Sequence, residues 1–272
     1  MHVVAQLIGY PRIGPNRELK WALERAWSGR SMPSEFAARL VELRQGHLDE
    51  QTELIGSAVD DFFLYDEVLE TALMLGIHPQ GLSDEPFELL TALARGTAQR
   101  EAWEMTKWFD TNYHYVVPEV DRLPERLVPL PWREPLAGSG AIWPVLGPYS
   151  LARLSKFHDL HATDLARAAG SAIGDWARSQ PAGFRLQLDE PCLGMRLDAT
   201  DEALRDAAYD ALGSIGSDGA PLVTVQFGAA SAGTLEALGR RGYAVQVRLD
   251  HVSSHAGVPV RDGTRSSGTW TA

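Results

Sequence analysis

The sequence of 272 residues contains one cysteine, Cys192, so neither an internal disulfide nor a zinc site with two cysteines can form within this chain. No apolar run reaches the roughly 18 residues that a membrane-spanning helix needs. The opening stretch MHVVAQLIGYPRIG has neither a basic segment nor a small-residue cleavage site, and therefore lacks the features of a secretory signal. From these absences we expect a soluble cytoplasmic protein without a membrane partner.

Positive charge is also scarce, and the formal net charge is -11. This balance argues against nucleic acid or an acidic membrane surface as a partner of the whole chain. Only three of the 25 basic residues are lysines, namely Lys20, Lys107 and Lys156. Because a lysine ammonium is a compact charge suited to carboxylate or phosphate, these three are candidates for an anion site. The alternative is that they are ordinary surface lysines.

Several familiar catalytic motifs are missing. The sequence has no P-loop, no GxGxxG fingerprint and no GxSxG nucleophile motif. His158 and His161 lie on one predicted helix, and His251 and His255 flank a loop, but no cysteine pair accompanies either set. We expect structural or solvated roles for these histidines, and we assign neither a metal ligand nor a catalytic residue to this chain.

Apolar segments alternate with helical patterns along most of the chain, which is typical of βαβ units that build a parallel sheet. The predicted strands are 3–10, the start of 58–76, 141–150, 184–191, 221–228 and 243–250. About six strands are recognisable, so residues 1–250 are predicted to form an α/β fold of the (β/α)₈ TIM-barrel type that is incomplete. Residues 251–272 are rich in Ser, Gly and Thr, and we expect a disordered tail there.

Two further expectations concern the second half of this pattern. One continuous helical stretch is predicted over 151–180, and a long proline-rich loop over 121–140. Pro144 fits a strand only at its start or at a position where the missing N–H is not needed.

The segment GPNRELKWALERAW predicts a helix with Asn16 as its N-cap and with cations in its first turn. Arg17 and Lys20 lie one turn apart on a shared face, at the helix end where the macrodipole disfavours positive charge. Free N–H groups at that end would form, together with these cations, a site for a carboxylate. The alternative is a solvated face on which Glu18 or Glu24 pairs with the cations.

A second candidate region is the aromatic segment EMTKWFDTNYHY. It places Lys107 beside two aromatic residues and close to Asn112, Tyr113 and His114. A cation with amide and phenol groups among aromatic rings suits a conjugated polar ligand. The alternative is an aromatic cluster that covers an edge of the core.

Adjacent carboxylates, Asp189 and Glu190, end the predicted strand 184–191. Because sites in barrel folds lie at the carboxyl ends of strands, both are candidates for an additional site. A retaining glycosidase would need a second carboxylate about 5 Å away, usually on another strand, and the sequence identifies none. The alternative is a structural role in which Asp189 accepts hydrogen bonds from loop N–H groups.

Five segments carry a family resemblance, in this order: GYPRIGPNRELKWALERAWSG, LYDEVLETALMLG, EMTKWFDTNYHYVVPE, PVLGPYSLARLSK and LQLDEPCL. Between residues 3 and 250 the chain closely resembles the N-terminal domain of cobalamin-independent methionine synthase. Members of this family are 5-methyltetrahydropteroyltriglutamate–homocysteine methyltransferases.

The resemblance implies a whole enzyme of two (β/α)₈ barrels with the active site between them. The C-terminal barrel would bind homocysteine and a zinc ion, which lowers the thiol pKa of homocysteine, through two cysteines, a histidine and a glutamate. No cobalamin takes part. The N-terminal barrel would bind the triglutamate tail of 5-methyltetrahydropteroyltriglutamate at the positions matching Arg17, Glu18, Leu19, Lys20 and Lys107.

The chain also departs from the family. Glu67 stands where members often have histidine, and neither the C-terminal barrel nor the last strands of the N-terminal barrel are recognisable. We therefore expect the folate-polyglutamate-binding part of a methionine synthase, which binds no zinc and transfers no methyl group alone. The alternatives are a non-catalytic folate-binding or interaction module, complementing a separate zinc-binding C-terminal half, and a truncated inactive remnant.

Overall fold

The computed structural model describes residues 6–215 and 221–246, which adopt a mixed α/β architecture around a parallel sheet. The sheet has the strand order β4 (Ile142–Leu146), β6 (Arg185–Asp189), β7 (Leu222–Thr224) and β8 (Ala244–Gln246). Its register places Leu188 beside Val145 on one side and Val223 on the other. All three side chains are buried, and so is every residue of β4, as expected for a parallel sheet covered on both faces. The predicted strands over 141–150, 184–191, 221–228 and 243–250 are confirmed.

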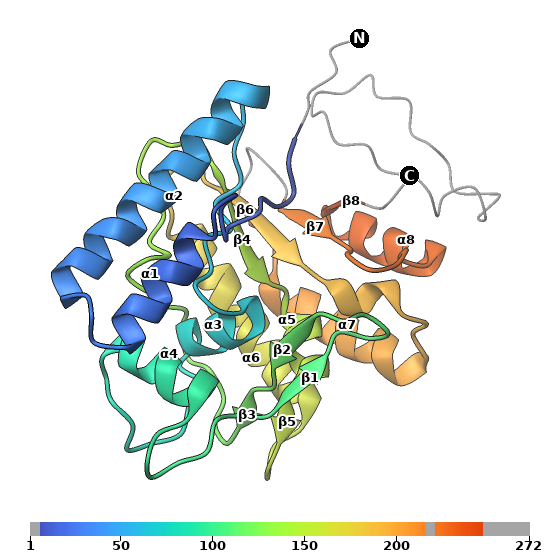
Figure 1. The fold of residues 1–272 in the computed structure, drawn as a ribbon. Coiled ribbons are helices and arrows are strands. Elements are labelled where there is room, and N and C mark those ends of the chain that lie inside the picture. Colours follow the sequence, from blue (N-terminus) through green and yellow to red (C-terminus); the bar gives the residue numbers. More distant parts are fainter. Residues whose placement is uncertain (1–5, 216–220, 247–272) are drawn as a thin grey trace.

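Helices surround this sheet (Figure 1). They are α1 (Glu18–Trp27), α2 (Pro33–Ile55), α3 (Glu67–Met74), α4 (Pro86–Arg95), α5 (Pro148–Leu154), α6 (Ala162–Arg178), α7 (Ala199–Leu212) and α8 (Ala232–Arg240). Helices α6 and α7 approach closely because Gly170 faces Ala208: a Cβ atom at Gly170 would lie 2.4 Å from the Ala208 carbonyl oxygen. In Figure 1, α1 and α2 lie on the β4 side of the sheet and α8 lies beside β7 and β8.

Smaller elements complete the described structure. An antiparallel hairpin is formed by β1 (Met105–Lys107) and β2 (His114–Val116). Two short parallel strands, β3 (Glu119–Val120) and β5 (Lys156–Phe157), pair with each other. A 3₁₀ turn, η1 (Pro191–Gly194), follows β6.

A short segment before α3 extends the sheet beyond β4. Val59 forms a parallel bridge with Ile142, whose N–H donates to the Ala58 carbonyl at 2.9 Å and whose carbonyl accepts from the Asp60 N–H at 2.7 Å. In a strand, every second residue directs its backbone groups toward the same neighbouring strand. Ile142 faces the segment before α3, so Pro144, two residues later, faces the same side and not β6. Its missing N–H is therefore not needed by the ladder between β4 and β6, which is the position predicted for a strand proline.

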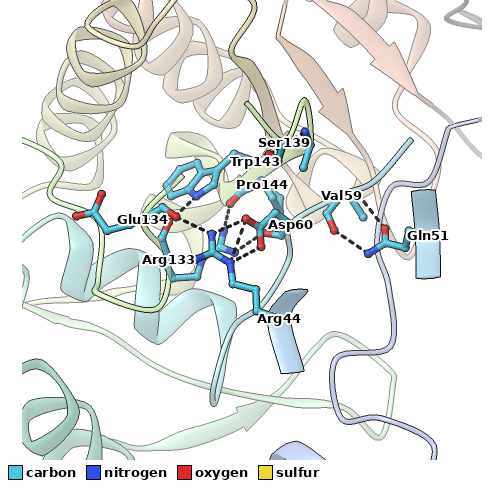
Figure 2. Close-up of polar contacts among 10 residues, drawn as sticks. Arg44, Gln51, Val59, Asp60, Arg133, Glu134, Ser139, Trp143 and Pro144 are labelled. Atoms are coloured by element: carbon cyan, nitrogen blue, oxygen red, sulfur yellow. Dashed lines mark hydrogen bonds and ion pairs between the residues drawn. The ribbon is translucent and has the colours of Figure 1, made fainter. Parts of the chain in front are cut away.

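Two buried arginines hold this segment in place (Figure 2). Arg44 of α2 forms an ion pair with Asp60, with an N–O distance of 2.5 Å. Arg133 is fully buried and donates to the carbonyl oxygens of Asp60 and Pro144, the latter at 2.6 Å. The Arg133 carbonyl in turn accepts a hydrogen bond from the indole N–H of Trp143 at 2.8 Å. These contacts link α2, the bridge segment and β4 into one unit.

Three local predictions were wrong. Residues 6–10 of the predicted strand 3–10 are not a strand; the Tyr10 N–H and the Ile8 carbonyl instead bond the side chains of Asp61 and Gln187. The helical stretch 151–180 is divided by β5, because the N–H of Lys156 bonds the Pro118 carbonyl at 2.8 Å. The N-cap of α1 is Arg17 rather than Asn16.

The larger architecture is confirmed in part. The described residues form a parallel sheet within an α/β fold but no closed barrel, so the TIM-barrel topology stays a prediction. The tail predicted over 251–272 lies outside the described residues. Within the described ranges, no helix combines the length and apolarity required to cross a membrane.

Candidate functional site

The start of α1 presents two exposed cations. Arg17 has a left-handed backbone conformation, with φ 62° and ψ 37°, and its side chain is exposed. Lys20 is also exposed, and its Nζ atom lies 5.3 Å from the centre of the Trp21 ring. Neither cation forms an ion pair with any residue that the structure describes, so pairing with Glu18 or Glu24 is not observed there.

The two residues between these cations have structural roles. The carboxylate of Glu18 accepts hydrogen bonds from the backbone and side-chain N–H groups of Asn16, at 3.1 and 3.0 Å. A hydrogen bond from its own backbone, followed by those from Asn16, holds the pKa of Glu18 below its usual range. Leu19 is fully buried, and its N–H bonds the Ile13 carbonyl at 3.2 Å. Of the predicted segment, only Arg17 and Lys20 offer free groups to a ligand.

The hairpin carries the other predicted residues. Lys107 pairs in register with His114, and Asn112 and Tyr113 lie in the turn between the strands. All four side chains are exposed, and that of Tyr113 is 71% exposed. Lys107 and His114 are therefore cross-strand neighbours, Asn112 and Tyr113 lie in the adjoining turn, and the role of these residues as a site stays a prediction. The hairpin itself was not predicted, because its strands are short.

The three lysines are in different environments. Lys156 forms an ion pair with Glu104 across β5 and the start of the hairpin, which gives it a structural partner. Lys20 and Lys107 have no carboxylate partner among the described residues. The two lysines available for an external anion are thus the two that lie in the predicted binding segments.

Both cationic regions are attached to the segment that precedes α3. The Arg12 guanidinium, in the loop before α1, donates to the Tyr65 carbonyl at 2.7 Å. The Val116 N–H of the hairpin donates to the carboxylate of Asp66 at 2.6 Å. Figure 1 draws α1 and the hairpin apart, with α3 between them in that view. A ligand that touches both regions must therefore be extended.

Asp189 and Glu190 do not act as a pair. The carboxylate of Glu190 accepts the N–H groups of Ser150 and Tyr149, at 2.7 and 3.2 Å, and therefore caps α5. Gly147 makes room for it, since a Cβ atom there would lie 2.2 Å from the Glu190 carboxyl carbon. Burial raises the pKa of Glu190 to about 7 despite these hydrogen bonds. The sequence suggested Asp189 as an acceptor of backbone N–H groups, and in the structure Glu190 accepts such groups at the start of α5.

The partner of Asp189 is Glu67, at the start of α3. Asp189 accepts hydrogen bonds from Gln187 at 2.9 Å and from the Thr224 hydroxyl, and it contacts the Glu67 carboxyl. Burial raises the pKa of both acids, and the charge of Asp189 raises that of Glu67 further. The surroundings of Glu67 therefore favour its protonated form. Sequence reasoning noted Glu67 only as a departure from the family, although its position after an apolar run could have indicated a strand-end residue.

The described residues offer no zinc ligand set. No group of three or more His, Cys, Asp or Glu side chains within 6–215 and 221–246 is arranged to hold a metal ion. Cys192 is buried, and burial raises the pKa of its thiol to about 12, so the thiolate that zinc requires is disfavoured. His251 and His255 lie outside the described residues.

Comparison with known proteins identifies the family. Residues 4–256 match the family model described as "Cobalamin-independent synthase, N-terminal domain". The chain belongs to this family. The match to the cobalamin-independent synthases includes both cationic segments and the strand that ends at Asp189.

Curated relatives are longer than this chain. The 5-methyltetrahydropteroyltriglutamate–homocysteine methyltransferase of Halalkalibacterium halodurans is 36% identical over 234 residues, covering 79% of this chain and 30% of the relative. The enzyme of the same name from Paraburkholderia xenovorans is 38% identical over 225 residues, covering 76% and 29%. That of Mycobacterium tuberculosis is 35% identical over 283 residues, covering 94% and 36%. The chain therefore spans about a third of the length of these synthases.

Proposed function

We propose that this chain is the folate-polyglutamate-binding part of a cobalamin-independent methionine synthase, an enzyme of methionine biosynthesis. Its ligand would be the triglutamate tail of 5-methyltetrahydropteroyltriglutamate. Methyl transfer to homocysteine would need a zinc-binding C-terminal barrel, which the family resemblance assigns to a separate part of the enzyme.

The observation that carries the proposal is which lysines are exposed without a carboxylate partner. Lys20 and Lys107 are exposed and lack carboxylate partners among the described residues, whereas Lys156 pairs with Glu104. A tail of linked γ-glutamates is extended and polyanionic, which suits two separated cationic groups in a chain of net charge -11. The names of the relatives state a triglutamate substrate for those enzymes.

Isothermal titration with the full chain tests this proposal. We expect triglutamate folate to bind at least tenfold more tightly than monoglutamate folate, a difference of about 1.4 kcal/mol. Lys20→Ala and Lys107→Ala should each reduce that preference, because each removes a charge that meets a ligand carboxylate. Lys156→Ala is the matched control, since its ammonium already pairs with Glu104.

Two results would contradict the proposal. One is equal affinity for the triglutamate and monoglutamate forms. The other is a loss of preference in Lys156→Ala as large as in Lys20→Ala, because that would indicate a general effect of net charge. A cooperative thermal melt of each variant confirms that the comparison is made between folded proteins.

The partial coverage of the relatives favours one further candidate function, a non-catalytic module that complements a separate zinc barrel. Methionine production on mixing with a C-terminal barrel of a relative, and none from either part alone, would support it. Production by the chain alone would overturn it. A non-cooperative melt of the full chain would instead indicate an inactive remnant.

A further inference from the structure

Three non-glycine residues have positive φ among those that the structure describes, namely Arg17 at 62°, Phe109 at 45° and Phe227 at 65°. This conformation is rare for bulky side chains and costs conformational free energy, so it persists where the surroundings enforce it. Arg17 is one of the proposed tail-binding residues. The other two are aromatic residues that contact each other, with ring centres 5.9 Å apart.

Backbone contacts flank both aromatic residues. Phe227 follows β7, and its neighbour Gly228 is pressed against Gly194 of η1: a Cβ atom at Gly228 would lie 2.6 Å from the Gly194 carbonyl oxygen. Phe109 lies in the hairpin turn, where the N–H of Thr111 bonds the carbonyl of Trp108 at 2.9 Å. Both rings are thus carried by loops that have backbone contacts of their own.

The rings form a small aromatic surface where the hairpin meets the carboxyl end of β7. Phe227 stacks on Trp108 with ring centres 5.6 Å apart and an interplanar angle of 28°. Trp108 is supported from within by Tyr115, at 4.9 Å. Phe227 nevertheless remains 45% exposed. Burial of this ring in the folded chain is therefore incomplete, although its backbone is held in a costly conformation.

Lys107 immediately precedes Trp108, so one of the free cations and part of the aromatic surface belong to the same hairpin. We propose that the exposed face of Phe227, backed by Trp108, stacks against the p-aminobenzoyl ring of the folate ligand while Lys107 binds the adjoining glutamate carboxylates. The inference rests on the proposed function and adds the orientation in which the folate ligand would bind. In a folate the benzoyl ring is joined directly to the first glutamate, so a lysine and an aromatic surface that share one hairpin suit that junction.

Titration with two synthetic probes tests the inference, namely tri-γ-glutamate and p-aminobenzoyl-tri-γ-glutamate. The full chain should bind the ring-bearing probe three- to tenfold more tightly. Phe227→Leu should remove this advantage and leave the affinity for tri-γ-glutamate unchanged, whereas Phe227→Tyr should retain it. Phe184→Leu is the control, because Phe184 is a partly buried ring that packs against Trp143 and Trp176 at the other end of β6.

The outcomes separate the two proposals. Equal affinity of the wild-type chain for both probes, or a ring advantage that survives in Phe227→Leu, overturns the stacking inference and leaves tail binding intact. Absence of binding by both probes overturns the proposed function together with the inference. Loss of tri-γ-glutamate binding in a folded Phe227→Leu variant also overturns the inference, because Phe227 would then act on the tail.

Discussion

Near the carboxyl ends of the strands, the acids Asp66, Glu67 and Glu190 have buried carboxyl oxygens, whereas the cations Lys20 and Lys107 are exposed. Asp66 and Glu190 accept backbone hydrogen bonds, and burial, followed by the charge of Asp189, raises the pKa of Glu67. The lysines have no partner within the described part of the chain. Their raised pKa values reduce the negative charge that these acids carry near neutral pH. The exposed cations can therefore attract an anion despite the net charge of -11.

The largest effect on stability is expected from a substitution among the buried charged residues. Arg133→Met removes a fully buried guanidinium that bonds the Asp60 and Pro144 carbonyls and lies 4.1 Å from the centre of the Phe63 ring. It leaves those acceptors and the neighbouring acids without their cation, so we expect a loss of about 3–5 kcal/mol in the free energy of unfolding. Urea denaturation measures it.

Arg167→Met on the exposed face of α6 is the control and should change stability by less than about 0.5 kcal/mol. Equal effects of the two substitutions would show that the buried network (Figure 2) does not determine the stability of this half of the fold.

The next effect concerns pH. Burial raises the pKa of Asp66 and Glu190 to about 7, against about 4 in an unfolded chain. Between these values the folded state binds protons that the unfolded state has lost. The stability from these groups is therefore complete below about pH 4 and is lost as the pH rises through 7. We expect the free energy of unfolding to be about 2 kcal/mol higher at pH 6 than at pH 8, by urea denaturation at constant ionic strength.

Greater stability at pH 8 than at pH 6 would contradict this prediction, because it would mean that the buried carboxyls are ionised in the folded state. Such a result would also remove the contrast between buried acids of reduced charge and exposed cations that are fully charged.

A smaller effect isolates the acid pair. Glu67→Gln keeps the shape of the side chain and replaces a carboxyl, whose charged form is disfavoured by burial and by Asp189, with a neutral amide. Because a raised pKa costs the folded state more as the pH rises above the unfolded value, we expect a gain in stability that is larger at pH 8 than at pH 6. Glu53→Gln on the exposed surface of α2 should have no pH-dependent effect. A loss of stability at pH 8 would indicate that the Glu67 carboxylate is held by a favourable interaction instead.

The sequence predicted the regular part of the fold for identifiable physical reasons, while the role of the exposed site residues stays a prediction. Strands β4, β6, β7 and β8 are short apolar runs separated by amphipathic helices, and such periodicity is local information. Lys20 and Lys107 were identified because lysine is rare in this chain and because the surrounding motifs resemble a family. Long-range pairings carry no such local signal. The division of 151–180 by β5 depends on Pro118, far away in the sequence.

The acid residues illustrate the same limit. Asp189 and Glu190 are adjacent in sequence, yet Glu190 caps α5 while Asp189 meets Glu67. Which of two neighbouring carboxyls meets a helix end depends on backbone direction after the strand and on the space left by Gly147. Neither is visible in a residue pattern.

The smallest effect on stability is expected from a substitution of one of the exposed cations. Lys20 lies in the first turn of α1, where the helix dipole disfavours positive charge, and it has no carboxylate partner among the described residues. Lys20→Gln should therefore raise the free energy of unfolding by about 0.3 kcal/mol at low salt, a gain that 0.5 M salt should screen. Lys156→Gln, the matched control, loses an exposed ion pair with Glu104 and should lower stability by at most about 1 kcal/mol. If Lys20→Gln instead destabilises the chain, Lys20 supports the fold of α1, and its availability for a ligand carboxylate loses its physical basis.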